Sequence, residues 1–492
     1  MLETVLHVGS ASSHNVSSVT AAFVALAGNT GGARIILHDD MVHSPFVVKP
    51  DAAGPQRPLR IEAAPNETPI VSGGVAVPAS FFQPDLRTGA APGTLVADLS
   101  KLNLSKASLG SLAPGNCVQE CAANTSFLSF AGKRMVSARW PNVANLSTDG
   151  WVWSSAGHKV GLGHFNLSEA STPEAALHAR RWIGESDPWL HGYWRIDWAD
   201  CHRAVNVSEV ANGTFQLQFD RTGPQDDVHK HARFYGTNLL SELDAPGEFY
   251  IDRQTLRLHF LPPTYLGADA PVVATEAGPV IDASGTSHVS LVGLHVLHGR
   301  GVGILAANTT SMRIDNCTVA LHGSDGISLS GVNSTVTRSV VHGTGCKGIH
   351  AFGGNATTLS PGNVSITHNR IFDFGTYKRT YQPALVHPVP RTRIGKNVEA
   401  GVCRLSVLPR KLRSGAESPT HTPTTSSRVG PTRVFSEVAT PPSPPTLTTF
   451  SRYACTQCAR ARSVRVHARV RVDVACARRC TLRARTPPVS AR

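Results

Sequence analysis

Acidic residues recur in the second half of the chain, close to short apolar runs, at Asp282, Asp315, Asp325 and Asp373. Hydrolysis of a glycosidic bond needs two carboxyl groups, about 5–5.5 Å apart for retention or about 6.5–9.5 Å apart for inversion. Asp325 precedes a Gly-Ile pair, and Asp315 alternates with an apolar neighbour and so points away from the core side of its strand. We therefore take Asp325 and Asp315 as candidate catalytic residues, although an Asp beside a glycine is more often a turn former.

Three histidines, His298, His322 and His342, precede glycines at similar spacing. If they occupy equivalent corners of a repeat, their rings form a column that could hold substrate hydroxyls or a metal, although such a stack is more often a matter of turn geometry. We take His322 and His342 as candidate substrate-binding residues and expect no metal and no cofactor.

All seven tryptophans of the chain lie between positions 140 and 198. A compact aromatic core explains such clustering, and a surface that stacks on sugar rings is the functional alternative. Trp189 and Trp194 are the candidates for such a surface. A polysaccharide lyase would use a basic residue, for which Arg338 and Lys347 are available, but no calcium-binding acidic cluster accompanies them.

The elements that position these residues are short repeated strands. Gly303-Ile304, Gly326-Ile327 and Gly348-Ile349 recur about every 22 residues, with brief alternating apolar runs between them. This period, with glycine at the corners, is typical of stacked parallel coils whose rungs lie about 4.8 Å apart. A leucine-rich solenoid lacks support because the fixed leucine spacing and the helical periodicity are missing. The sequence predicts an all-β fold, a right-handed parallel β-helix.

The repeat divides the chain into four predicted parts. Residues 1–92 form an N-terminal cap, with a strand at Val5–Val8 and a helix that begins near Ser18 and ends near Gly28, followed by the first coils. Residues 93–268 interrupt the repeat and form an inserted Trp-rich β-domain. Residues 269–377 carry the β-helix repeats, and residues 378–492 form a disordered basic tail.

Several motifs in the interrupted region resemble those of β-helical glycoside hydrolases of the fucosidase and xylanase type and, more loosely, pectin-lyase-like proteins. They are Ser-Ala-Arg-Trp-Pro-Asn at 137–142, Asp-Pro-Trp-Leu-His-Gly-Tyr-Trp at 187–194, Asp-Trp-Ala-Asp at 197–200 and Glu-Leu-Asp-Ala-Pro-Gly-Glu-Phe-Tyr-Ile-Asp-Arg at 242–253. The resemblance runs from about residue 5 to 383 and implies a carbohydrate-active, usually exported protein. It also implies further coils with active-site acids, so this chain is expected to be truncated.

The predicted tail carries 22 Lys and Arg against 4 Asp and Glu, a net charge of +18. Because the whole chain carries +13, the remainder carries −5, and we expect no nucleic-acid partner. The tail is rich in Pro, Ser and Thr and too poor in apolar residues to fold. Three explanations stay open: a basic arm, a zinc site at Cys455, Cys458, Cys476 and Cys480, or translation of an unspliced intron.

Glycosylation sequons are frequent before residue 377 and do not occur after it. They favour a glycoprotein of the extracellular space or secretory pathway, although the sequence starts with no signal-peptide pattern, and asparagine is also a common turn former. No segment is apolar for long enough to span a membrane. The candidate glycosylation sites are Asn124, Asn145, Asn206, Asn308, Asn333 and Asn355.

Cysteine spacing gives a weaker signal. Cys117 and Cys121 are close enough to bridge one loop, whereas Cys317 and Cys346 fit the interior of the coil as thiols.

Together these features predict a carbohydrate-active β-helix protein derived from a polysaccharide glycoside hydrolase, with a glycan as its partner and a monomeric state. Whether this chain is still an enzyme is left open, and a hydrolase is favoured over a lyase. The alternative is a non-catalytic glycan-binding or surface β-helix protein.

Overall fold

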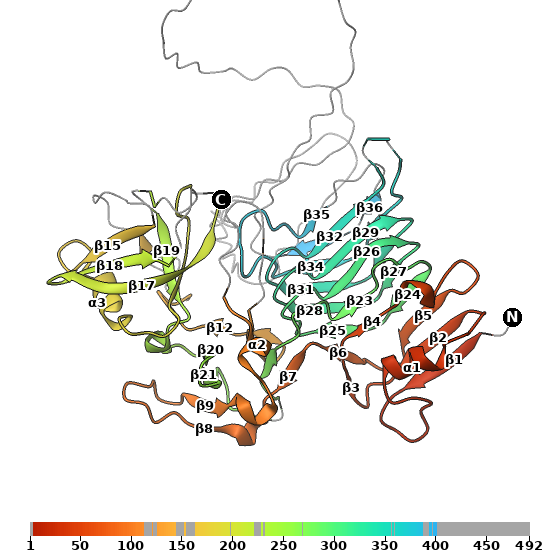
Figure 1. Ribbon diagram of the computed structural model, residues 1–492, viewed down its shortest axis with the longest axis horizontal. Coiled ribbons are helices and arrows are strands. Elements are labelled where there is room, and N and C mark those ends of the chain that lie inside the picture. Colours follow the sequence, from red (N-terminus) through yellow and green to blue (C-terminus); the bar gives the residue numbers. More distant parts are fainter. Residues whose placement is uncertain are drawn as a thin grey trace, which may run out of the picture.

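The computed structural model describes residues 3–112, 121, 125–143, 152–153, 163–196, 198–220, 228–229, 232–267, 269–355, 357–358, 360–386, 393–395 and 397–400. Three parallel sheets form the faces of a right-handed β-helix, which confirms the predicted fold class. Figure 1 shows the stacked coils on one side and a second group of strands beside them. Within the described residues, no helix has both the length and the apolar run needed to cross a bilayer.

A complete coil contributes one strand to each sheet, and the first and last described coils contribute fewer. The eight-stranded sheet contains β1 (Thr4–Val8), β2 (Ala33–Leu37), β5 (Leu59–Ala63), β24 (Val289–Val292), β27 (Arg313–Asp315), β30 (Thr335–Thr337), β33 (Ser365–Thr367) and β36 (Arg393–Gly395). The seven-stranded sheet contains β3 (Val42–His43), β6 (Ile70–Ser72), β25 (His295–Leu297), β28 (Thr318–His322), β31 (Val340–Thr344), β34 (Arg370–Phe372) and β37 (Val398–Ala400). The six-stranded sheet contains β4 (Phe46–Val47), β23 (Ile281–Asp282), β26 (Ile304–Thr310), β29 (Ile327–Val332), β32 (Ile349–Gly353) and β35 (Leu385–Val386).

Alternation within the strands builds the core, because every second side chain points into the coil. In the eight-stranded sheet, Ile61, Leu291, Ile314, Val336 and Ile366 pair in successive register and are fully buried. Stacking like side chains in this way removes apolar surface from water along the whole axis.

A short helix covers the first rung, as the sequence predicts. Helix α1 (Val19–Ala25) begins after Ser18, whose hydroxyl oxygen accepts a hydrogen bond from the Ala21 amide. Val19 and Ala22 are buried against the first coil, so the helix shields the end of the core from water.

Early and late coils stack directly on each other, although more than 200 residues separate them. Ile61 of β5 pairs with Leu291 of β24, and Phe46 of β4 pairs with Ile281 of β23. The chain between them therefore leaves the coil and returns to it, which is the insertion that the interrupted repeat predicts.

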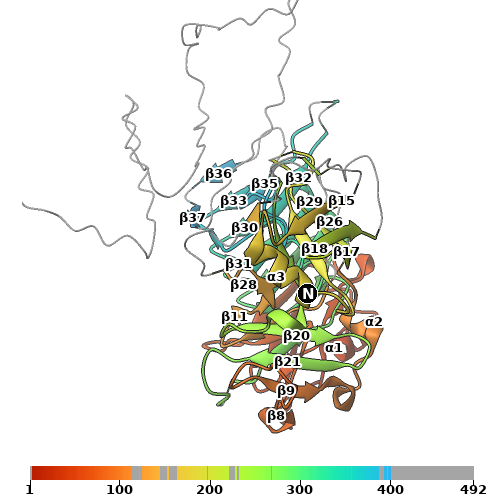
Figure 2. The ribbon, with the colours of Figure 1, turned by 90° about the vertical axis from the view of Figure 1, so that its left-hand side faces the viewer.

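The inserted residues form three further sheets, antiparallel except for the parallel pair of β12 and β20, and lie in front of the coils in Figure 2. A four-stranded sheet joins them to the coil: β11 (Lys133–Arg134), β10 (Leu128–Phe130), β22 (Val272–Ala274) and β7 (Gly74–Ala76). A five-stranded sheet contains β12 (Val136–Ser137), β20 (Glu248–Asp252), β21 (Arg257–Leu261), β9 (Leu95–Asp98) and β8 (Phe82–Pro84). A seven-stranded sheet contains β13 (Arg139–Trp140), β19 (Arg233–Thr237), β16 (Trp189–Gly192), β17 (Cys201–Ala211), β18 (Thr214–Phe219) and β15 (His164–Ser168), with β14 (Val152–Trp153) also on β19.

Two α-helices and four short 3-10 helices complete the elements. They are α2 (Lys106–Leu109), α3 (Pro173–Arg181), Pro50–Ala52, Ala79–Phe81, Leu99–Leu102 and Leu240–Glu242. Helix α3 packs on β15, β17 and β18 through Ala175, Ala176 and Ala179, which belong to the aromatic core of the inserted domain.

The coil continues beyond residue 377, so the predicted start of the tail at 378 is wrong. β35, β36 and β37 pair in parallel with β32, β33 and β34 and add a further turn. Two asparagines also link this turn to the one before it, because the Asn397 side chain accepts hydrogen bonds from the backbone and side-chain amides of Asn369. The predicted tail from 401 onward lies outside the described residues.

A disulfide joins the inserted domain to the coil. Cys121 is bonded to Cys346, with Cα atoms 5.9 Å apart. The predicted Cys117–Cys121 bridge and the predicted free thiol at Cys346 are therefore wrong, because tertiary folding brings together residues 225 positions apart. The interior thiol predicted at Cys317 is confirmed, and Cys201 is also disulfide-bonded.

Candidate functional site

Asp325 lies at the corner that precedes β29, where its side chain is 11% exposed. The Gly-Ile pairs at the start of β29 and β32 stack in register, which places the carboxylate over the next rung. One carboxylate oxygen accepts a hydrogen bond of 2.9 Å from the Lys347 amide, and the other lies 3.3 Å from Nδ1 of His350. The corner thus holds a fixed carboxylate against an imidazole.

The outward face of β32 adds an aromatic ring next to this pair. Ile349 and Ala351 point into the coil and are fully buried, so His350 and Phe352 face outward. Their rings meet edge to face with centroids 4.2 Å apart, and Phe352 is 38% exposed.

The inserted domain meets the coil segment 378–380 through a buried aspartate, Asp200. Its carboxylate lies 2.7 Å from Nε2 of His191 and accepts backbone hydrogen bonds from Arg379 and Thr380. Burial alone would raise the pKa of Asp200, but the His191 hydrogen bond and charge and the backbone donors outweigh burial and hold that pKa below its usual range. Burial lowers the pKa of His191, and the bond to Asp200 opposes it.

Beside Asp200, two aromatic rings face each other across the junction. Trp198 of the inserted domain is 54% exposed, and its ring lies 5.8 Å from that of Tyr381, nearly perpendicular to it. Lys378 connects the two parts, because its ammonium donates to the Asp200 carbonyl at 2.8 Å; burial, together with repulsion from nearby cations that include Lys347, lowers the pKa of Lys378. We call the following set the corner surface: Asp325, Lys347, His350, Phe352, Trp198 and Tyr381.

Sequence reasoning found Asp325 but missed the aromatic pair. Trp198 lies in one of the motifs that carry the family resemblance, which was the available signal for it. Tyr381 lies in the segment after residue 377 that carries no repeat pattern, so its approach to Trp198 is visible only in three dimensions.

The predicted sugar-stacking residues Trp189 and Trp194 lie in the interior of the inserted domain. They are 5% and 1% exposed. The Trp189 indole donates to an Asp187 carboxylate oxygen at 2.7 Å, and the Trp194 indole donates to the Cys201 carbonyl at 3.2 Å. This burial supports a core role and weighs against contact with a sugar.

The predicted histidine column is wrong. His342 pairs with Ala320, whereas His322 pairs with Thr344, so the two histidines lie two register positions apart. The offset arises because the two histidines are 20 positions apart, whereas paired residues of these two rungs are 22 positions apart.

Each of the two histidines has a structural environment. The Gly299 amide donates to Nδ1 of the fully buried His322, whose Nε2 donates to the Val296 carbonyl at 3.0 Å. Burial lowers the pKa of His322 to about 3, so the ring is neutral at physiological pH. His342 stacks on Phe372 with ring centroids 4.6 Å apart.

Asp315, the second predicted acid, lies on a different face from Asp325. It belongs to the eight-stranded sheet, is 3% exposed, and forms ion pairs with Arg313 at 2.6 Å and with Arg338. The structure therefore does not bring the two predicted acids together as a hydrolytic pair.

Four of the predicted glycosylation asparagines are exposed: Asn206, Asn308, Asn333 and Asn355. Asn308 and Asn333 both have φ of 55°, the left-handed conformation that asparagine tolerates well, so turn geometry alone accounts for their residue type. Asn124 and Asn145 lie outside the described residues.

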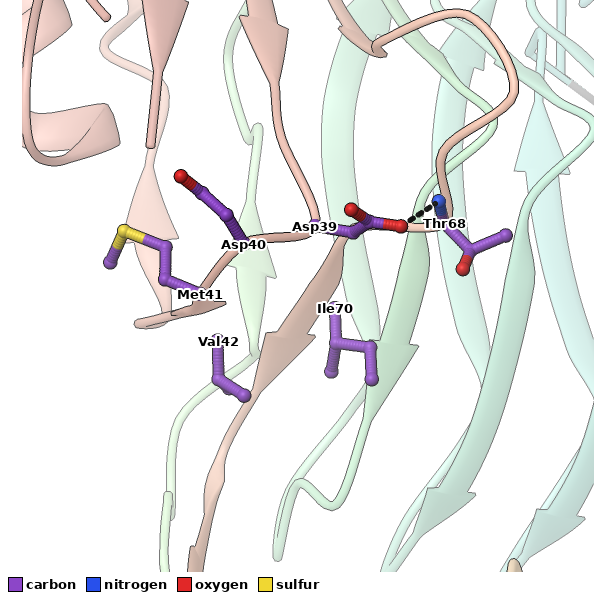
Figure 3. A pocket seen from close by; sticks show the side chains of 6 residues that line it. All are labelled: Asp39, Asp40, Met41, Val42, Thr68 and Ile70. Carbon is purple, nitrogen blue, oxygen red and sulfur yellow. Dashed lines mark hydrogen bonds between the residues drawn. The ribbon is translucent and has the colours of Figure 1, made fainter. Parts of the chain in front are cut away.

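A separate pocket of about 380 Å³ opens on the N-terminal coils (Figure 3). Figure 3 shows the carboxylates of Asp39 and Asp40 pointing in different directions. Asp39 accepts a hydrogen bond from the Thr68 amide at 3.2 Å, and Asp40 accepts hydrogen bonds from the Ser10 and Ala11 amides. Both carboxylates hold loops in place and do not converge on the pocket.

Comparisons with known proteins agree with the fold. The family described as "Right handed beta helix region" matches residues 273–379. A solved structure described as a glycoside hydrolase is similar with a TM-score of 0.57 and 13% identity, covering 80% of this chain and 79% of that one. A structure described as a complex of XylC with xylose aligns with a TM-score of 0.37 and 10% identity, over 82% and 68% of the two chains. No curated protein matches the sequence.

Proposed function

We propose that this chain is a carbohydrate-active β-helix protein that binds a glycan at the corner surface. The observation that carries the proposal is the pair formed by Trp198 and Tyr381, one ring from the inserted domain and one from the coil. An indole that is 54% exposed leaves much of a large apolar ring in contact with water. The C–H face of a sugar ring is a partner that could cover it.

The surroundings of this pair suit a sugar as well as the rings do. Lys347 and His350 of the coil provide donors, and the Asp325 carboxylate provides an acceptor. An apolar platform with a few polar groups is the usual composition of a small-molecule or glycan site.

The resemblance in fold to a glycoside hydrolase supports a carbohydrate ligand without specifying which one. The Cys121–Cys346 disulfide and the exposed sequon asparagines support an extracellular or secretory location, because structural disulfides persist in oxidising compartments. Location and glycosylation are thus part of the proposal.

Hydrolysis is the second candidate, and the contact between Asp325 and His350 favours it. A carboxylate held 3.3 Å from an imidazole can exchange a proton with it, as general acid–base catalysis requires. Asp315 lies on another sheet, so the partner carboxylate that this chemistry needs is not supplied by the predicted pair.

Binding is tested with an array of cell-wall and matrix oligosaccharides, followed by titration calorimetry of any ligand found. Trp198→Ala should weaken affinity at least tenfold, which corresponds to about 1.4 kcal/mol of lost stacking. The matched control is Tyr265→Ala, which removes an aromatic ring that is 91% exposed in the same inserted domain. Equal affinity for the Trp198 variant and the wild type would refute the proposed site.

Hydrolysis is tested by release of reducing ends from the glycans that bind. If the chain is an enzyme that uses Asp325, Asp325→Asn should abolish this release and leave glycan affinity within a few-fold of the wild type. Binding without any release of reducing ends in the wild type would leave glycan binding as the function.

A further inference from the structure

We infer that Asp200 is a positioning residue that assembles the corner surface by fixing Tyr381 opposite Trp198. The inference rests on the proposed glycan-binding function, to which it adds a residue that touches no ligand itself. Asp200 is fully buried, two positions after Trp198, and among the described residues it hydrogen-bonds across the junction to the three residues immediately before Tyr381.

Both oxygens of the carboxylate bind this segment. One accepts hydrogen bonds from the Thr380 amide at 2.9 Å and from the Thr380 hydroxyl. The other accepts a hydrogen bond from the Arg379 amide at 2.8 Å and also faces His191. A carboxylate that accepts several backbone amides holds a loop in a single arrangement, because both of its oxygens act only as acceptors.

The main chain of Asp200 also hydrogen-bonds to this segment. Its amide donates to the Thr380 hydroxyl at 3.3 Å, and its carbonyl accepts from the Lys378 ammonium at 2.8 Å. Asp200 therefore contacts Lys378, Arg379 and Thr380, and Tyr381 is the next residue in the chain.

The backbone conformation of Tyr381 requires that its neighbours be held in place. Its φ of 59° is in the left-handed region, which costs a non-glycine residue free energy and persists only where the surroundings impose it. Release of the preceding residues would let Tyr381 return to an ordinary conformation and leave Trp198 without its partner ring.

Aromatic and imidazole rings pack around His191, the histidine that contacts the Asp200 carboxylate. Nδ1 of His191 lies 2.5 Å from the Tyr235 hydroxyl, and the His202 ring stacks on both His191 and Tyr377 at 4.2 Å. These rings come from β16, β17 and β19 and from the coil segment, so strands of the inserted domain hold the Asp200 carboxylate in position.

The test uses Asp200→Asn in the full chain. Asparagine keeps the size of the side chain but replaces one acceptor oxygen with an NH2 group that faces backbone donors. We expect glycan affinity to fall at least tenfold, and we expect Asp200→Asn combined with Trp198→Ala to bind no more weakly than Trp198→Ala alone.

A second readout follows the segment without any glycan. Limited trypsin digestion should cut after Lys378 and Arg379 at least tenfold faster in Asp200→Asn, because the amides that Asp200 holds in the wild type are released. If Asp200→Asn does not fold, Thr380→Val keeps the shape of the residue and removes its hydroxyl, and it should show the same two changes to a smaller extent.

The matched control is Asp85→Asn, which removes another buried carboxylate of the inserted domain that is paired with a histidine, His259, at 2.8 Å. It should lower thermal stability and leave both affinity and digestion at residue 379 unchanged. The inference would be overturned if trypsin cut Asp200→Asn at the wild-type rate. It would also be overturned if Asp200→Asn lost no more glycan affinity than Asp85→Asn. Unchanged glycan binding by Trp198→Ala, together with faster digestion of Asp200→Asn, would refute the proposed function. The conclusion that Asp200 fixes residues 378–380 would still hold.

Discussion

At the scale of single residues, position within a rung decides what a titratable side chain can do. His322 points into the corner of the coil, where two backbone groups use both of its ring nitrogens. Asp325, only three positions later, lies at the outer corner and keeps a partial exposure. Three positions along a coil therefore separate a fully buried side chain from one that keeps some contact with solvent.

His322 makes the stability of the protein depend on pH. Its pKa is about 3 in the folded protein against 6.5 for an ordinary histidine, so the unfolded chain takes up the proton first as pH falls. The stability from the neutral ring is complete above pH 6.5 and is lost as pH falls toward 3. Between pH 7 and pH 5 the loss should be about 2 kcal/mol.

Chemical denaturation at pH 7 and pH 5 tests this expectation. His322→Gln should be less stable than the wild type at pH 7 and should lose less stability on going to pH 5. His164→Gln, a substitution on β15 of the inserted domain, serves as the control. Parallel pH profiles for wild type and His322→Gln would contradict the assignment.

Residue-scale prediction from the sequence succeeded where strand alternation decides direction. Alternation correctly placed Asp315 opposite to the core, and the Gly-Ile repeat correctly placed Asp325 at a corner. It could not show that Asp315 is enclosed by two arginines or that Trp198 meets Tyr381, since both depend on contacts between separate strands or domains.

At the scale of elements, the corners of the coil are as constrained as the strands. Gly331 has φ of 140°, and a Cβ atom built on it would lie 1.8 Å from the Thr309 carbonyl oxygen of the rung before. Backbone conformation and close approach both exclude a side chain there. Close approach also excludes a side chain at Gly303, Gly326 and Gly348, the glycines that marked the repeat in the sequence, which is why the period predicted the fold.

Gly331→Ala should therefore destabilise the protein by about 3 kcal/mol or more, because the backbone of two rungs must move apart. The control is Gly54→Ala in an early coil, where the nearest atom to an added Cβ is 4.0 Å away. Thermal unfolding of the two variants beside the wild type measures the difference. A Gly331 variant as stable as the Gly54 variant would show that the corner can adapt.

At the scale of the whole molecule, the insertion was predictable and the end of the coil was not. The insertion interrupts a clear period and gathers the tryptophans, and it leaves the first coils in register with the later ones. The segment from 378 to 386 lacks a repeat, yet it buries Lys378, Thr380 and Gln382 and supplies β35. Its order comes from contacts with Asp200 of the inserted domain and with β32 of the coil, which no local sequence pattern records.

Two shortened chains test where the folded part ends. A chain that stops after Tyr377 loses β35 to β37 and the contacts to Asp200, so it should melt at a clearly lower temperature and give less soluble protein. A chain that stops after Ala400 keeps all described elements and should melt near the temperature of the full chain. Equal behaviour of the two shortened chains would contradict the role given to residues 378–400.

The direct stacking of β5 on β24 has a consequence for synthesis. When β5 leaves the ribosome, the strand that will cover its open edge is more than 200 residues away. At about 5–20 residues per second, the first coils wait roughly 10–40 s with that edge uncovered. During this interval the nascent chain presents an unpaired parallel edge, so the insertion sets a period in which early release or a delayed chaperone would favour association between chains.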